Sequence, residues 1–118
     1  MLDKNKRKYP RAEVQLEVFV AGGDEGREYT VQAVNISAGG VCISLPDFIA
    51  ADTQVEMVVK LPDSGSPLET KGRIAWSLER RKLLKRKEPL FDTGIEFVEL
   101  AQEERQRLIR FTQDILFR

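Results

Sequence analysis

Two short stretches of the sequence combine residue types that bind anions. The first is KRKYPR, residues 6–11, which places Arg7 and Arg11 four residues apart with Lys6 and Lys8 beside them. A guanidinium group donates two parallel hydrogen bonds to phosphate oxygens, and a lysine adds a point charge. The bland alternative is a solvated basic tail. The residue types therefore predict either an anion-binding site or a solvated charged tail just before the first strand.

The second stretch is NISAGG, residues 35–40, at the end of a predicted strand. Asn35 and Ser37 are two residues apart, so their side chains point to the same face, and each can donate and accept hydrogen bonds. Gly39 and Gly40 allow a sharp backbone turn and the close approach of a ligand. Taken alone, the stretch also suits an ordinary polar turn between two strands.

The remaining residues offer little for catalysis. The chain has no histidine, which removes the usual general base near neutral pH and the commonest zinc ligand. Its single cysteine, Cys42, lies within a predicted strand, where a thiol is usually inert packing. Neither a GxxxxGK[ST] loop nor a GxGxxG motif is present. We therefore expect no catalytic residue, no metal, no cofactor and no enzyme activity.

Positive charge is concentrated in two segments although the formal net charge is zero. One is the N-terminal stretch and the other is the basic run at 80–87, and the rest of the chain has more acidic than basic residues. Because a protein that wraps nucleic acid carries broad positive charge, this distribution favours a compact anionic ligand. We interpret the run at 80–87 as solvated surface. A contact surface for an acidic partner, with Leu83 and Leu84 at its centre, is the alternative.

The elements that must position these residues are mostly strands. Apolar and polar residues alternate, with Gly- and Pro-rich turns between the runs. This pattern predicts strands at 12–20, 27–37, 41–45, 55–61, 69–78 and 91–100. In the fifth of these we expect Ile74 and Trp76 on one face, with Trp76 in the core.

The tail changes to a helical period. Its apolar stripe consists of Leu108, Phe111, Ile115 and Leu116. This spacing predicts an amphipathic helix at 101–117. Six short strands and one helix indicate a small antiparallel barrel or sandwich with a helix packed on it.

Length and hydropathy set the remaining bounds. A chain of 118 residues fits one domain. No apolar run approaches the roughly 20 residues of a membrane helix, and no apolar region follows the charged N-terminus as in a secretory signal. We therefore expect a cytoplasmic protein without membrane insertion.

The two motifs, in this order on this strand pattern, resemble the PilZ domain, a bacterial receptor for cyclic di-GMP. RxxxR precedes a strand, a turn, a second strand and NxSxxG, and the stretches GRIAWS (72–77) and TGIEFVEL (93–100) also look like that family. The resemblance implies a six-stranded antiparallel β-barrel with a C-terminal helix, formed by 12–118. It also implies that a flexible arginine loop at 1–11 closes on a dinucleotide held against the barrel face.

The resemblance carries ligand roles to particular residues. Arg7 and Arg11 match the arginines that bind phosphate and guanine, Asn35 and Ser37 match the positions that bond the guanine edge, and Gly40 gives room for the base. We add Lys6, Lys8 and Gly39 as further candidates. Tyr9 and Pro10 are expected to stiffen the loop and pack on the barrel rim.

One residue departs from the commonest family pattern. Family members that bind a stacked ligand dimer often carry an arginine directly before RxxxR, where this chain has Lys6. A lysine lacks the planar fork that stacks on a base, so one or two ligands per chain both stay open, with two favoured.

The resemblance implies an adaptor. Ligand binding is expected to order residues 1–11 across the barrel and so change a surface for a downstream bacterial protein in a motility, chemosensory, polysaccharide or developmental pathway. Two alternatives stay open: a PilZ-like interaction module that binds no nucleotide, and a small RNA- or DNA-binding barrel. The acidic body of the chain disfavours the second.

Overall fold

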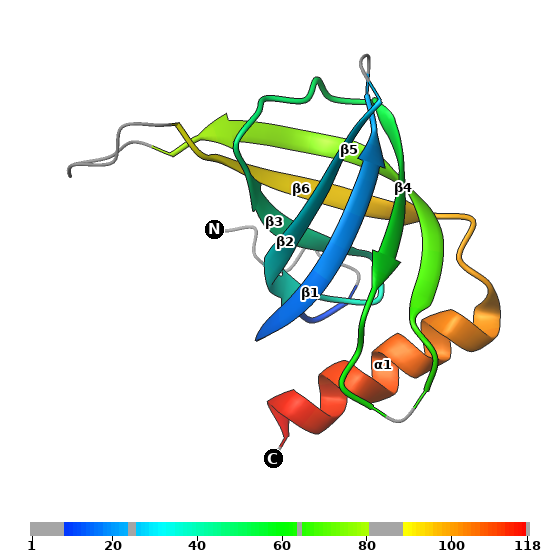
Figure 1. Cartoon of the computed structure of the whole chain (residues 1–118). Coiled ribbons are helices and arrows are strands. Elements are labelled where there is room, and N and C mark those ends of the chain that lie inside the picture. Colours follow the sequence, from blue (N-terminus) through cyan, green and yellow to red (C-terminus); the bar gives the residue numbers. More distant parts are fainter. Residues whose placement is uncertain (1–8, 24–25, 64, 81–88, 118) are drawn as a thin grey trace.

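The computed structural model describes residues 9–23, 26–63, 65–80 and 89–117. Within these residues it has six strands followed by one helix (Figure 1). The elements are β1 (Ala12–Gly22), β2 (Arg27–Ile36), β3 (Gly40–Leu45), β4 (Gln54–Val59), β5 (Leu68–Glu79), β6 (Phe91–Val98) and α1 (Gln102–Leu116). Each predicted element is present, with bounds that shift by at most two residues.

The strands close into an antiparallel barrel in the order β1-β2-β3-β6-β5-β4. The barrel closes because β1 pairs with β2 along one edge and with β4 along the other. The predicted six-stranded antiparallel barrel is therefore confirmed, and the sandwich alternative is wrong. Closure pairs each strand with a neighbour on both sides over part of its length, which shortens the edges that could template aggregation.

The core fills the inside of the barrel with aliphatic side chains from every strand. In β1 the alternating residues Leu16, Val18 and Val20 are buried, as the period-2 pattern predicts. Ile43 of β3 and Ile74 of β5 are fully buried on the same inner face. Each such side chain contributes about 1.5–3 kcal/mol to the hydrophobic free energy of folding.

Helix α1 lies beside one end of the barrel, next to the connection between β4 and β5 (Figure 1). Leu108 is fully buried, and Phe111 and Ile115 are half-buried, as predicted. The predicted stripe is wrong at Leu116, which is 41% exposed. Its place in the buried face is taken by Thr112, whose hydroxyl donates a hydrogen bond to the Leu108 carbonyl and so needs no other partner.

A β-bulge in β5 overturns the prediction for Trp76. Ile74 pairs with Ile95, whereas Trp76 pairs with Gly94, so Ala75 is an extra residue in the strand. Because side chains alternate with a period of two, this insertion places Trp76 on the opposite face from Ile74. Trp76 is half-buried on the outer face of the barrel instead of lying in the core.

A second bulge acts in the same way on β2. The register between β2 and β3 shifts between Ala33 and Asn35, so that Val34 is the extra residue. Ala33 and Ile36 are both buried in the core, and Asn35 faces outward between them.

No helix within the described ranges has the length and apolar character to cross a membrane.

Candidate ligand-binding site

A pocket of about 390 Å³ lies on the outer face of the barrel. Its floor is one row of paired residues that crosses four strands: Asn35 of β2 pairs with Cys42 of β3, Cys42 with Gly94 of β6, and Gly94 with Trp76 of β5. The two bulges turn the end members of this row, Asn35 and Trp76, toward the outer face. The barrel thus brings a polar amide and an aromatic ring to opposite ends of one shallow hollow.

The pocket gathers five of the predicted site residues. Arg11, Asn35, Ser37, Gly39 and Gly40 all line it. The geometry therefore unites the part of RxxxR nearest to the barrel with the whole NxSxxG motif. The other predicted candidates, Lys6, Arg7 and Lys8, lie outside the described residues.

Backbone hydrogen bonds fix the loop at residues 37–40. The Ser37 amide donates to the Gly40 carbonyl at 2.9 Å, and the Phe97 amide donates to the Gly39 carbonyl at 2.9 Å. The Ser37 hydroxyl oxygen accepts the Gly39 amide at 3.0 Å. Ser37 therefore shapes the loop in addition to facing the pocket, and its hydroxyl hydrogen is left to donate.

Gly40 is required by the approach of strand β6. A Cβ atom at Gly40 would lie 2.3 Å from the Ile95 carbonyl oxygen and 3.2 Å from the Glu96 Cα. Both neighbours are backbone atoms, which cannot rotate away. The packing of the barrel thus requires glycine at the last position of NxSxxG. This requirement is separate from the room for a base that the resemblance implies.

Tyr9 packs on the rim of the barrel, as the sequence interpretation expected. Its ring is partly buried against the core cluster, with Cδ2 at 3.3 Å from where a Cβ of Gly39 would lie. The Arg105 guanidinium of α1 lies 5.6 Å from the centroid of the same ring. Arg105 also donates a hydrogen bond to the Ala38 carbonyl at 2.9 Å. Sequence reasoning gave no role to Arg105, because a helix position carries no signal of a contact 67 residues away.

Trp76, which sequence reasoning placed in the core, lines the pocket instead. Its indole lies over Gly94: a Cβ there would stand 2.5 Å from the ring atoms Cε2 and Nε1. Glycine at 94 therefore lets the ring lie down on strand β6 and line the pocket. The run Ile74-Ala75-Trp76 is apolar throughout, so the pattern does not show that Ala75 is an extra residue.

The charges around the pocket are mixed. Arg11 is an exposed cation within it, while Glu96 supplies a carboxylate that is ion-paired with Arg73. Burial raises the pKa of the Cys42 thiol on the floor, and the nearby Asp92 carboxylate raises it further. The thiol is therefore protonated at neutral pH, in agreement with its interpretation as inert packing.

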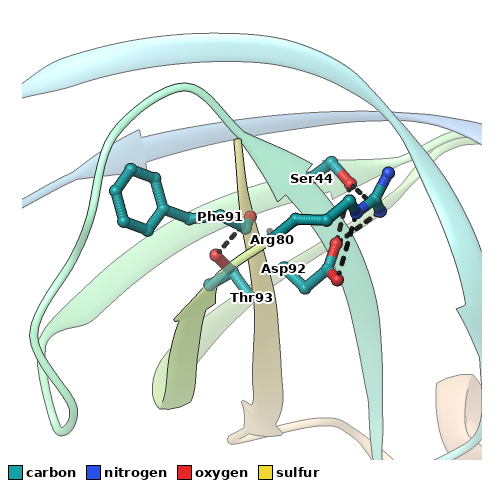
Figure 2. A network of polar contacts seen from close by, with 5 residues as sticks. All are labelled: Ser44, Arg80, Phe91, Asp92 and Thr93. Atoms are coloured by element: carbon teal, nitrogen blue, oxygen red, sulfur yellow. Dashed lines mark hydrogen bonds and ion pairs between the residues drawn. The ribbon is translucent and has the colours of Figure 1, made fainter. Parts of the chain in front are cut away.

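A polar network continues along the same outer face beyond the pocket (Figure 2). Arg80 donates to Asp92 Oδ1 at 2.6 Å and to the Ser44 hydroxyl at 3.2 Å, and Ser44 donates to the same Asp92 oxygen at 3.1 Å. The first residue of the basic run is therefore bonded to the barrel instead of being simply solvated. The rest of that run, 81–87, lies outside the described residues.

A second hollow, of about 440 Å³, lies between the β1–β2 turn and the connection from β3 to β4. Its only carboxylate among the lining residues, Asp47, accepts hydrogen bonds from Arg27 at 2.8 Å and from Tyr29 at 2.6 Å. The cation there is neutralised by its partner, and none of the predicted site residues lines this hollow. The smaller pocket is therefore the candidate site on chemical grounds.

Comparison with solved structures shows the same barrel in other proteins. The PilZ domain of YcgR from Escherichia coli, solved with c-di-GMP, superposes with a TM-score of 0.71 at 11% identity, covering 96% of this chain and 93% of that one. MotI/DgrA, the inhibitor of motility of Bacillus subtilis, gives a TM-score of 0.77 at 21% identity over 96% of this chain and 52% of its own. The c-di-GMP complex of MrkH from K. pneumonia gives 0.75 at 16% identity over 96% and 53%.

The chain spans about half the length of MotI/DgrA and of MrkH. At these identities the likeness establishes the fold. A comparison with curated proteins gives no sequence match.

A family model supplies the sequence evidence. The model of the PilZ domain matches residues 5–114, a range that includes RxxxR, NxSxxG, all six described strands and most of α1. The membership expected from the two motifs is confirmed: the chain belongs to the PilZ domain family.

Proposed function

We propose that this protein is a cyclic di-GMP receptor that holds the dinucleotide between its RxxxR segment and the outer face of the barrel. The observation that carries the proposal is the single pocket in which Arg11 meets Asn35, Ser37 and Trp76. A cation, two hydrogen-bonding side chains and an aromatic face match a ligand that combines phosphates with flat, polar bases. Two solved relatives in the same fold, YcgR and MrkH, were determined with c-di-GMP.

Each side chain has one role in this proposal. Arg7 and Arg11 bind the phosphates and the acceptor edge of guanine, as guanidinium groups do bidentately. The Asn35 amide and the Ser37 hydroxyl hydrogen bond the guanine edge. Trp76 supplies the stacking surface, a role added here to the residues that the motifs name.

The individual contacts each contribute a few kcal/mol to the free energy of binding. A hydrogen bond to a charged group contributes about 1.5–3 kcal/mol, and stacking of a base contributes about 1–3 kcal/mol. Ordering a flexible segment costs about 1–2 kcal/mol per residue. We expect a dissociation constant near micromolar, which corresponds to about −8 kcal/mol.

The proposed output is a change of surface rather than a reaction. The chain has no histidine, and its one thiol is buried and protonated, so we propose a binding protein and not an enzyme. Ligand that favours an ordered arrangement of residues 1–11 shifts the receptor toward that state and so presents or hides a surface for a partner. We propose a cytoplasmic receptor whose partner belongs to a motility, chemosensory, polysaccharide or developmental pathway. MotI/DgrA, an inhibitor of motility, is a relative with an output of this kind.

Isothermal titration of cyclic di-GMP at physiological salt tests the proposal. Wild type should bind near micromolar, and both Arg7→Ala and Arg11→Ala should weaken binding at least about thirtyfold. Arg110→Ala, an exposed arginine on α1 outside the pocket, is the matched control and should bind like wild type.

Two further results would change the assignment. Absence of heat with an unshifted melting temperature in wild type would refute the receptor and leave the nucleotide-independent interaction module. Displacement of cyclic di-GMP by an oligonucleotide would instead indicate a general anion binder.

A further inference from the structure

One side chain of α1 contacts both halves of the candidate site. The Nη1 atom of Arg105 donates to the Ala38 carbonyl at 2.9 Å, and its guanidinium lies 5.6 Å from the centroid of the Tyr9 ring. Ala38 is the middle of the NxSxxG motif, and Tyr9 stands two residues before Arg11. Arg105 thus joins the two segments that the proposed ligand must bridge.

The contact with Ala38 is costly to remove. Ala38 is 1% exposed, and a buried carbonyl that loses its hydrogen bond also loses any replacement by water. The Ser37 amide and the Gly39 carbonyl of this loop are held by Gly40 of β3 and Phe97 of β6, and the Gly39 amide by the Ser37 hydroxyl. The Ala38 carbonyl is therefore the point at which the helix, rather than the barrel, sets the position of the loop.

The contact with Tyr9 is a cation–π interaction at the edge of the pocket. The Tyr9 ring also lies beside Gly39, so its position depends on the loop and on Arg105 together. Moving this ring moves the backbone that leads into Arg11. A guanidinium suits both contacts at once, because its plane lies against a ring while its N–H groups point outward to acceptors.

We propose that Arg105 is a positioning residue of the ligand site. It holds the 37–40 loop and the Tyr9–Arg11 segment at the separation that the dinucleotide requires, and it couples the docking of α1 to ligand binding. The inference rests on the proposed function. Because coupling free energies are reciprocal, bound ligand must in turn stabilise the docked helix.

Arg107 provides a matched comparison within the same helix. Its guanidinium bonds both carboxylate oxygens of Asp63, at 2.9 and 2.7 Å, and so tethers α1 to the β4–β5 connection. It does not line the candidate pocket. A variant at Arg107 therefore weakens the attachment of the helix without touching the two site segments, which separates positioning from simple tethering.

The experiment compares Arg105→Gln, Arg105→Lys and Arg107→Gln by titration with cyclic di-GMP and by melting temperature. Arg105→Gln should bind about tenfold more weakly than wild type. Arg105→Lys should recover part of the loss, because lysine can donate to Ala38 but has no planar group to lie on Tyr9. Arg107→Gln should lower the melting temperature and leave the dissociation constant within about twofold of wild type.

A double-mutant cycle and hydrogen exchange complete the test. In the Arg105→Gln background, Tyr9→Leu should weaken binding by less than about twofold, whereas alone it should weaken binding severalfold. Saturating ligand should slow amide exchange in α1 of wild type but not of Arg105→Gln.

The outcomes separate the two proposals. Wild type that binds cyclic di-GMP, with Arg105→Gln binding equally well or Arg107→Gln losing as much affinity, would overturn the positioning role alone. Wild type that does not bind would overturn the proposed function and the positioning role together.

Discussion

A methyl group added at Gly94 should disable the candidate site without disturbing the core. The new Cβ would lie 2.5 Å from Cε2 and Nε1 of Trp76, closer than such atoms approach in proteins. Gly94 faces the outer surface, and its inward-facing neighbours, Thr93 and Ile95, keep their places in the barrel. The nearest group is a side chain rather than backbone, so Gly94→Ala relieves the clash by turning the indole out of the pocket.

The two consequences of Gly94→Ala differ in size. A displaced indole removes a stacking contribution of about 1–3 kcal/mol, which corresponds to roughly 5- to 150-fold in the dissociation constant. The strain of the added methyl typically costs about 1–3 kcal/mol of folding free energy. The replacement of glycine by alanine offsets about 0.4–1 kcal/mol of it through the unfolded chain. The loss of binding free energy should therefore be at least as large as the loss of folding free energy.

Intrinsic fluorescence gives a direct assay, because Trp76 is the only tryptophan of the chain. In wild type, cyclic di-GMP should change the emission in a saturable way as a guanine stacks on the indole. Gly94→Ala should show red-shifted emission without ligand, since the ring is more exposed, and a much weaker response to ligand. Trp76→Phe, followed by calorimetry, should keep part of the affinity because a smaller ring still stacks.

The reasoning fails if Gly94→Ala has the emission maximum and dissociation constant of wild type. It also fails if Trp76→Ala binds cyclic di-GMP as tightly as wild type, because the indole would then lie beside the ligand without contributing. A circular dichroism spectrum and a melting curve show whether the barrel is intact in each variant.

Three further predictions concern other parts of the chain. Gly40→Ala should lower the melting temperature more than Gly94→Ala does, because its Cβ would meet the Ile95 carbonyl oxygen at 2.3 Å and backbone cannot turn aside; equal melting temperatures would contradict this. The hydrogen bonds from Arg107 hold the pKa of Asp63 below its ordinary value of 3.8, so the pair stabilises the fold above that pH and loses this contribution as the pH falls through the lowered pKa. The difference in melting temperature between wild type and Asp63→Asn should accordingly shrink below about pH 4, and a difference that grows there would refute the assignment. Titration should give two cyclic di-GMP per chain in Lys6→Arg, and a wild-type value of one would show that the planar fork, not the charge, recruits the second ligand.

The fold was readable from the sequence because its strands obey simple alternation. In β1, the buried residues Leu16, Val18 and Val20 alternate with residues that are not buried, which describes a strand with one inner face, and α1 shows its change of period around Leu108. The predicted apolar stripe of α1 was wrong near its C-terminal end, where Thr112 is buried instead of Leu116. Burial of Thr112 is possible because its hydroxyl donates to the Leu108 carbonyl of the same helix. Hydrophobicity alone cannot reveal a polar side chain that satisfies itself in this way.

The site was readable only in its motifs. Arg11, Asn35 and Ser37 were named from residue type and order, and the barrel brings them to one pocket. Trp76 was placed wrongly because the bulge at Ala75 reverses which face the following residues occupy, and a run of three apolar residues does not show where the extra residue lies. Arg105 was missed because the contact joins a helix to a loop 67 residues earlier, and no local pattern encodes that pairing.

The two bulges give this face of the barrel the outward-facing side chains that the proposed ligand requires. Without the bulges, Asn35 and Trp76 would face inward, like Ala33 and Ile74. The outer row would then contain only Cys42 and Gly94 of the four paired residues. The extra residues in β2 and β5 turn the amide and the indole outward at opposite ends of one row, while the core keeps its aliphatic neighbours. Bulges beside binding sites commonly serve to re-aim a side chain in this way.

The same row argues against a simple anion as the ligand. Inorganic phosphate would need cations around it, but within the described part of the pocket Arg11 shares the wall with the Glu96 carboxylate, an aromatic ring and an amide. Because Glu96 is ion-paired with Arg73, the pair adds no net positive charge for a dense anion, whereas the carboxylate can still accept a hydrogen bond from the N–H donors of a guanine edge. If the pocket serves a base with phosphate attached, excess inorganic phosphate should not displace cyclic di-GMP in the fluorescence titration. GMP should compete only weakly, because it has one phosphate and one base where cyclic di-GMP has two of each. Full displacement by inorganic phosphate would instead show that the pocket binds anions through Arg11 alone and does not recognise a base.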